Sequence, residues 1–127
     1  MVHTPLMKLI SLILTAIVAL LHIGFLVLES ILWTTPTGME ISGYSPEQAE
    51  ITAVLALNQG AYNGILAAGL LWAVIASKKD VAIFFLAAVV FAGVVGAVTA
   101  SERILFIQAL PGALALLATL VARWRVG

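Results

Sequence analysis

Residues 9–28 read LISLILTAIVALLHIGFLVL, an apolar run that contains no lysine, arginine, aspartate or glutamate. A helix over this run is about 30 Å long, which matches the hydrocarbon thickness of a bilayer. With its flanks, the run predicts a first membrane-spanning helix over residues 7–33. A signal peptide is the alternative, because Lys8 would supply its basic region. The run is too long for one, however, and no small-residue cleavage pattern follows it.

The whole chain shares this apolar composition. Of its 127 residues, 63% are hydrophobic and 9% are charged, and the mean hydropathy is +1.18. A soluble domain is about half apolar and about a quarter charged, so a water-soluble fold of this size could not bury so much apolar surface. We therefore expect an all-α, polytopic membrane protein in a single domain, residues 1–127, with membrane lipid as its surroundings.

Charge and cysteine content exclude several classes of function. Six basic residues balance six acidic ones, and the basic residues stand in short groups between apolar runs, which excludes nucleic acid as a partner. The chain has no cysteine, which excludes disulfides, thiol catalysis and thiolate metal ligands. Its two histidines are too few to form a metal site alone, and we expect neither a metal nor a cofactor.

Three further spans follow, and with the first they predict a four-helix bundle. They are expected over residues 51–77, 81–100 and 103–122. Ser45 and Gln48 form the pattern of a capping box, so the second helix should begin in solvent, before its span. Asp80 and Ser101 are expected as the N-caps of the third and fourth helices. The short links between the last three spans make them antiparallel neighbours.

The positions of lysine and arginine predict the orientation of the bundle. Five of the six basic residues fall on one side of the predicted spans: Lys8, Lys78, Lys79, Arg123 and Arg125. Arg103 alone falls on the other side. By the positive-inside rule, the N and C termini are then cytoplasmic. The outer side carries the loop expected over residues 34–45, which contains the helix breakers Pro36, Gly38 and Gly43.

Small residues on two spans predict close helix packing. On the third span they recur every four positions, at Ala88, Ala92, Gly96 and Ala100, and on the second span Gly60 and Gly64 form a GxxxG pattern. In lipid, helices associate where small residues let their backbones approach. We interpret both patterns as seams within the bundle. A homodimer formed through these small-residue faces is the alternative.

Glu29 bears most directly on function, because a charged carboxylate inside hydrocarbon is costly unless it is paired, hydrated or protonated. It lies one turn before Trp33, which we expect to anchor at the headgroup level. Glu29 is either an interfacial carboxylate that reaches headgroup water or a carboxyl that faces the bundle and handles a cation or a proton. His22 lies on the same helix face about 10 Å away, and is either an interhelical hydrogen-bond donor or a proton partner.

Polar side chains also cluster on the second and fourth spans. Asn58 and Tyr62 are spaced i,i+4, as are Gln59 and Asn63, and we expect these groups not to face lipid. They either join helices by hydrogen bonds worth about 1 kcal/mol each or line a polar pocket. On the fourth span, Pro111 cannot donate to the carbonyl of Ile107 and predicts a kink one turn beyond Gln108, which is a plain distortion or a cavity wall.

These residues lie at comparable depth in the predicted orientation, in the outer half of the membrane. We therefore expect one outward-facing polar pocket around Glu29. Its candidate binding residues are His22, Glu29, Trp33, Asn58, Gln59, Tyr62, Asn63 and Gln108.

Three segments of the sequence carry a family resemblance: ESILWTTP at residues 29–36, LNQGAYNG at 57–64 and QALP at 108–111. Together they resemble the small bacterial membrane proteins grouped as domain of unknown function 1304. That family often has a basic residue soon after the TTP, where residues 37–40 read TGME here. The resemblance implies four spans and multi-pass insertion in a bacterial plasma membrane. It implies no activity.

The sequence leaves three functions open. The first is binding or transport of a small molecule, a cation or a proton in the pocket around Glu29. The second is a membrane enzyme on a lipophilic substrate, with Glu29 as acid or base and Tyr62 or His22 as its proton partner. The third is a structural or assembly subunit, which the small-residue stripes favour.

Overall fold

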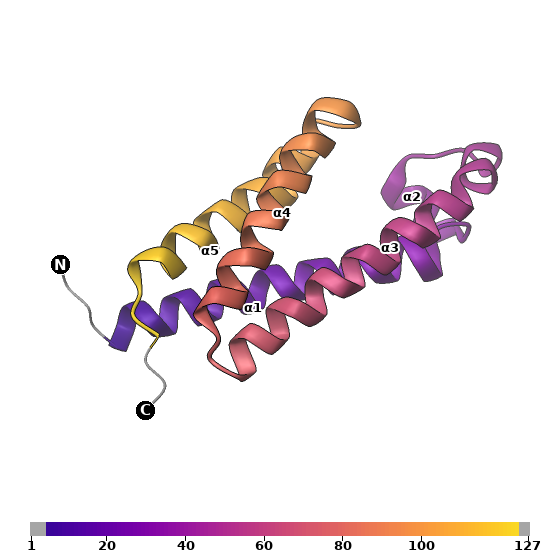
Figure 1. Cartoon of the computed structure of the whole chain (residues 1–127). Coiled ribbons are helices and arrows are strands. Elements are labelled where there is room, and N and C mark those ends of the chain that lie inside the picture. Colours follow the sequence, from indigo (N-terminus) through magenta and orange to yellow (C-terminus); the bar gives the residue numbers. More distant parts are fainter. Residues whose placement is uncertain (1–4, 125–127) are drawn as a thin grey trace.

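The computed structural model describes residues 5–124, and they fold as helices without any strand (Figure 1). The helices in chain order are α1 (Pro5–Val27), η1 (Leu28–Leu32), α2 (Pro36–Ser42), α3 (Pro46–Ile75), α4 (Lys79–Thr99), η2 (Leu105–Ala109) and α5 (Leu110–Val121). The segments η1 and η2 are single π-helical turns, each continuous with the α-helix beside it. The all-α prediction is confirmed.

Three helices are long and apolar enough to cross a membrane: Pro5–Leu32, Pro46–Ile75 and Lys79–Thr99. The last helix, Leu105–Val121, is apolar but shorter. Large apolar side chains are exposed along the outward faces of the helices, and Ile51, Ile75 and Val98 each have more than 80% of their surface exposed. Such faces are typical of a protein whose surroundings are lipid.

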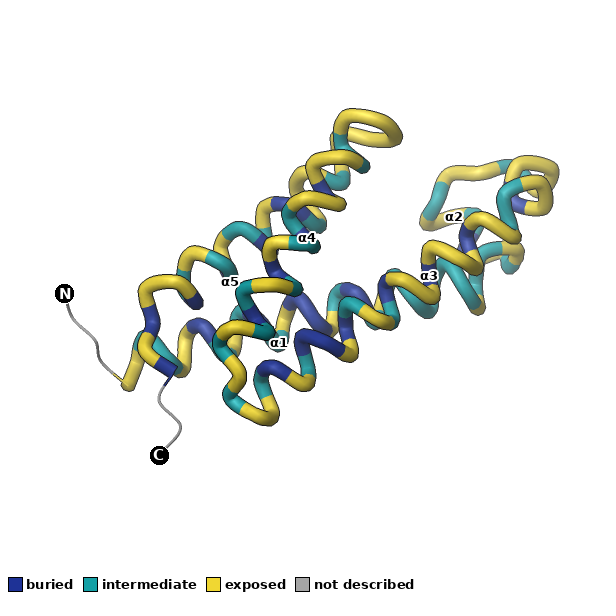
Figure 2. The backbone as a smooth tube through the Cα atoms, viewed as in Figure 1, coloured by how far each residue is buried: buried dark blue, intermediate teal, exposed yellow. Residues whose placement is uncertain are grey.

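The helices form two antiparallel hairpins, α1 with α3 and α4 with α5 (Figure 1). Both chain ends and the α3–α4 link lie at one end of the molecule, where the hairpins pack together. Toward the other end the hairpins diverge. Figure 2 shows the buried residues on the facing sides of the helices. The core contains Val18, Ala19, Leu70, Ala73, Ala82, Leu86, Val89 and Ala115.

The start of α3 follows the sequence prediction, whereas two other details correct it. Ser45 and Gln48 form the expected capping box. The segment 34–45, expected as a loop, contains the two-turn helix α2, because the Thr35 side chain accepts from the Gly38 N–H as an N-cap. Asp80 is not an N-cap, because α4 begins one residue earlier and Asp80 lies in its first turn.

The glycines of the predicted seams pack inside the chain. Gly60 of α3 faces Ser30 of η1, and Gly64 of α3 faces Leu26 of α1. In the other hairpin, Gly93 of α4 faces Ala109 of η2. The alanines of the α4 stripe behave differently, since Ala92 and Ala100 are exposed. The seam on α4 therefore follows its glycines.

Candidate functional site

The π-helical turn η1 brings Glu29 against α3. Gly60 makes this approach possible, because a Cβ atom there would overlap Ser30 Oγ and lie 3.2 Å from Glu29 Cβ. One turn further along α3, the amide Nδ2 of Asn63 donates to Glu29 Oε1 over 3.1 Å. Asn63 is itself buried. The last residue of the predicted cluster and the predicted carboxyl therefore meet.

Two buried acceptors near this contact have no donor within the described residues, namely Glu29 Oε2 and His22 Nε2. His22 is fully buried, and its Nδ1 lies 2.8 Å from the carbonyl oxygen of Val18. A carbonyl only accepts, so Nδ1 carries the proton and Nε2 of the neutral ring is left as an acceptor. Buried polar groups are nearly always hydrogen-bonded, so each of these two atoms can accept one further hydrogen bond.

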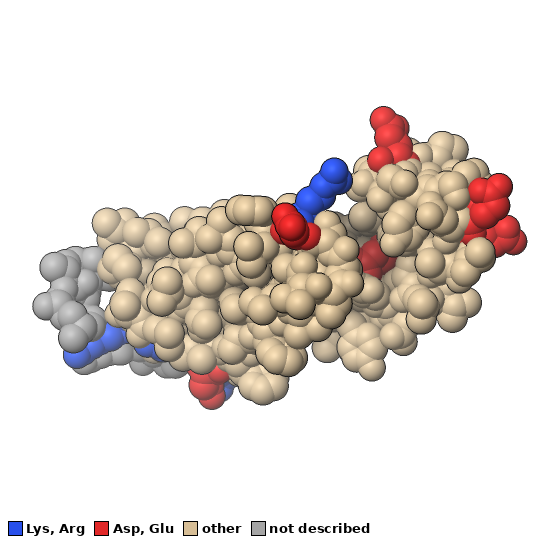
Figure 3. Space-filling view, turned by 90° about the horizontal axis from the view of Figure 1, so that it is seen from above, with Lys and Arg blue, Asp and Glu red and all other residues tan. Residues whose placement is uncertain are grey.

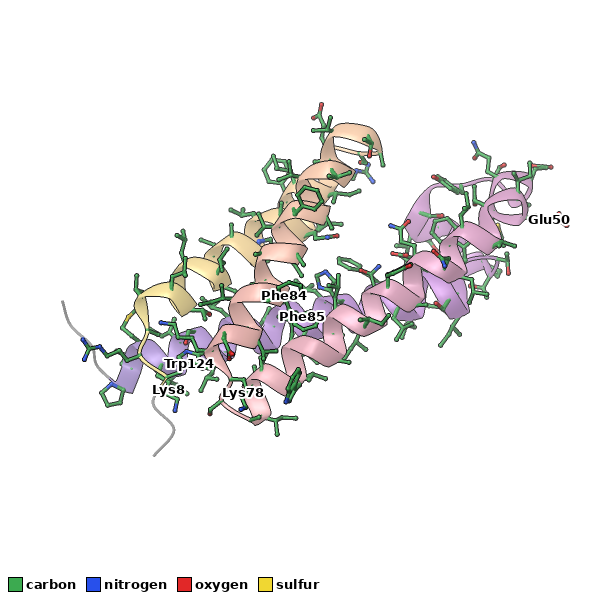
Figure 4. The ribbon with its side chains drawn as sticks, viewed as in Figure 1. Lys8, Glu50, Lys78, Phe84, Phe85 and Trp124 are labelled. Atoms are coloured by element: carbon green, nitrogen blue, oxygen red, sulfur yellow. The ribbon has the colours of Figure 1, made fainter. Side chains whose placement is uncertain are left out.

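Asn58, Gln59 and Tyr62 are exposed, unlike Asn63. Tyr62 lies on the same side of α3 as Gly69, two turns away, and Gly69 packs against the ring of Phe85 on α4. Beyond that contact α4 diverges from α3, and the polar side of α3 is left uncovered. Figure 4 shows Phe84 and Phe85 near the point of divergence.

A hollow lies between the diverging hairpins. In the space-filling view the surface is indented there, and one acidic side chain is recessed in the indentation (Figure 3). Other acidic side chains gather over the end that carries α2 and the start of α3. Basic side chains lie toward the opposite end, except for one that projects beside an acidic side chain at the edge of the indentation. We call the polar surface formed by Glu29 and Asn63 with the exposed Asn58, Gln59 and Tyr62 of α3 the outer hollow.

Gln108 belongs to the second hairpin and bonds within it. Its Nε2 donates to the carbonyl of Val89 on α4 over 3.3 Å. The kink expected near Pro111 takes the form of the π-helical turn η2, in which the N–H of Leu110 reaches back to the carbonyl of Leu105. A proline ring cannot donate and crowds the preceding turn, so a widened turn relieves it. Gln108 therefore fastens η2 to α4.

Trp33 also joins two helical segments through its side chain. Its indole Nε1 donates to Thr52 Oγ1 over 2.9 Å, and its ring meets the ring of Tyr44 edge-on. These contacts join the outer end of the first hairpin to the segment that follows α2. Trp33 thus supports the outer end of the site through α3.

Two sets of hydrogen bonds at the end of the molecule that carries the α3–α4 link were not predicted from the sequence. The indole of Trp124 is buried and donates to Ser11 Oγ over 2.8 Å. Lys79 Nζ donates to the carbonyls of Leu120 and Ala122, which are the free acceptors at the end of α5. Figure 4 shows Trp124 and Lys8 close together at this end. The sequence shows a tryptophan after the last span, but whether that tryptophan is buried depends on tertiary packing, which the sequence does not report.

The long apolar helices and the half-buried carboxyl of Glu29 define an all-helical protein with the features of a small membrane protein. The chain belongs to the family described as Protein of unknown function (DUF1304), whose model matches residues 16–120. It is similar to the Uncharacterized protein YpaA of Lactococcus lactis subsp. lactis (strain IL1403), with 29% identity over 116 residues, covering 88% of this chain and 95% of that protein. No solved structure matches it. The matched segment includes every residue of the outer hollow.

Proposed function

We propose that the chain crosses a bacterial plasma membrane four times, with both termini in the cytoplasm. The apolar helix Leu105–Val121 supports a fourth span, although it is the shortest. The basic residues near the chain ends and the α3–α4 link support the orientation. The outer hollow then opens away from the cytoplasm.

Single-cysteine labelling tests this topology, and the cysteine-free chain provides a clean background. In intact cells a membrane-impermeant maleimide should label Glu40→Cys on α2 and should not label Lys78→Cys beside the α3–α4 link. After permeabilisation both variants should react. Labelling of Lys78→Cys in intact cells, alone or together with Glu40→Cys, would contradict the proposed orientation.

Within this frame we propose that the outer hollow binds a small organic cation, as a receptor or a transporter. The observation that carries the proposal is the Glu29 carboxyl, which lies within a spanning helix with Oε2 buried and without a donor. An ammonium group is both a donor and a positive charge, so it supplies what this oxygen lacks. Polar groups that are buried in spanning helices most often mark ligand or ion pathways.

The opposite walls of the hollow favour an amphiphilic amine. Tyr62 stands thirteen residues before Ile75 and Ala92 thirteen residues after Lys79, so each lies about 20 Å along its helix from the α3–α4 link. Ala88 and Ala92 continue the side of α4 that carries Phe85. One wall therefore offers amide and phenol groups, and the other offers small apolar side chains. A ligand with an ammonium and a compact apolar part matches both.

Benzylammonium is a suitable probe for this site, with binding measured by calorimetry on the purified protein in lipid nanodiscs. Glu29→Gln should weaken binding at least ~30-fold, because removing one member of a buried charge pair costs about 2 kcal/mol or more. The matched control is Glu40→Gln, which makes the same change on the exposed α2 and should leave affinity unchanged. Equal binding by wild type and Glu29→Gln, or no binding by wild type, would refute the proposal.

A further inference from the structure

We infer that the outer hollow exchanges a cation for a proton, one for one, at Glu29. The inference rests on the proposed binding of an organic cation and adds the coupling to it. It follows from the charge surroundings of the carboxyl. The exchange would let a proton gradient drive the movement or the release of the amine.

No basic side chain of the helices that pack against η1 lies beside Glu29, and Arg103 belongs to the other hairpin. The helices packed against η1 are α1, α2 and α3. Their titratable or charged side chains are Lys8, His22, Glu40, Glu47, Glu50 and Tyr62. Three of these are further carboxyls at the outer end, and Lys8 lies about 30 Å away along the axis of α1. The bond that Glu29 does make is to Asn63, whose amide is neutral.

His22 does not supply a positive charge either. Its Nδ1–H is donated to the Val18 carbonyl, and Nε2 faces no acceptor. A protonated ring would therefore bury both a charge and an unsatisfied N–H donor. The ring is neutral in this arrangement, and it leaves the charge on Glu29 unbalanced.

Two states of the site avoid a bare buried charge. In the empty site the carboxyl keeps its proton, so a neutral O–H without a partner, and not a charge, is buried there, and Oε1 still accepts from Asn63. In the loaded site the carboxylate pairs with an ammonium, and the pair is neutral as a unit. Passage from one state to the other breaks the O–H bond of the carboxyl and releases its proton to water in the outer hollow, while an N–H donor of the ammonium takes its place on the oxygen. The charge inside the protein is the same before and after.

Infrared spectroscopy of the empty protein gives the first test, because it needs no ligand. In nanodiscs near neutral pH the wild type should show the C=O stretch of a protonated carboxyl, shifted by ²H₂O, and Glu29→Gln should lack it. Glu29→Gln should fold normally, since a neutral carboxamide has nearly the shape of the protonated acid. If wild type and Glu29→Gln give the same spectrum in this region, the carboxyl is ionised in the empty site and the inference fails.

Addition of benzylammonium to weakly buffered protein gives the second test, with a pH-indicator dye as the readout. About one proton should be released for each amine bound, and the carboxyl band should disappear in parallel. His22→Gln should release the same proton, whereas loss of release in that variant would move the exchange from Glu29 to His22 and overturn the assignment. Binding without proton release would overturn the exchange and leave the proposed function standing. Absence of binding would overturn both.

Discussion

The Gly60→Ala variant is expected to lose about 1–3 kcal/mol of unfolding free energy and to bind benzylammonium several-fold more weakly than wild type. The added methyl group would overlap Ser30 Oγ and press on Glu29 Cβ, which lies 3.2 Å from the Cβ position. The η1 turn must then move away from α3, and the Asn63–Glu29 hydrogen bond of 3.1 Å lengthens or breaks. Unfolding in mixed micelles and calorimetry measure the two effects.

Two companion variants make this prediction specific. Gly24→Ala adds the same methyl group where no atom lies within 4 Å, and it should leave both stability and affinity unchanged. Adding Ser30→Ala to Gly60→Ala removes the hydroxyl that clashes most severely, so the double variant should recover part of both losses. If Gly60→Ala behaves like Gly24→Ala, the close approach of η1 and α3 is wrong.

Gly93→Ala is expected to destabilise the protein at least as much, and without a simple rescue. A Cβ atom at Gly93 would lie 2.8 Å from the backbone nitrogen of Ala109 and 3.0 Å from its Cα. Because the clash is with backbone, trimming a side chain of η2 cannot relieve it, and the α4–η2 seam must open. The expected loss is about 2–3 kcal/mol, measured by the same unfolding experiment.

The Gly60→Ala and Gly93→Ala variants should differ in their affinity for benzylammonium. Gly93 belongs to the hairpin of α4 and α5, whereas Glu29 and Asn63 belong to the other hairpin. Because Gly93 directly follows Ala92, which the proposal places at the apolar wall of the hollow, Gly93→Ala should weaken benzylammonium binding, but less than Gly60→Ala does, at temperatures where the variant is folded. A loss of affinity as large as that of Gly60→Ala would show that the site depends equally on both hairpins.

The long helices were predictable because the membrane imposes their pattern. Residues 7–33 and 81–100 are apolar over a bilayer's width, and the structure places Pro5–Leu32 and Lys79–Thr99 there. The capping box at Ser45 was predictable because it depends only on neighbouring residues. The helix α2 could not be predicted, because its segment is rich in helix breakers and its N-cap depends on the orientation of one threonine side chain.

The candidate site was predictable only in part. Glu29 and Asn63 were both named from the sequence, since each is an expensive polar group within an apolar helix. Their contact depends on the π-helical turn η1 and on Gly60, and no spacing rule for α-helices reports a π-helical turn. The exposure of Asn58 and Tyr62 depends on the divergence of the hairpins, which is set by packing between helices distant in sequence. Gln108 lies on the hairpin opposite Glu29 for the same reason.

A structure determined in lipid with an iodinated benzylammonium at saturating concentration tests the central claim most directly. Iodine scatters strongly, so its position identifies the bound amine. We expect one site in the outer hollow, with the ammonium within hydrogen-bond distance of Glu29 Oε2 and the iodinated ring toward Ala88 and Ala92 of α4. An amine bound elsewhere, or a basic side chain paired with Glu29 in place of the ligand, would contradict the account.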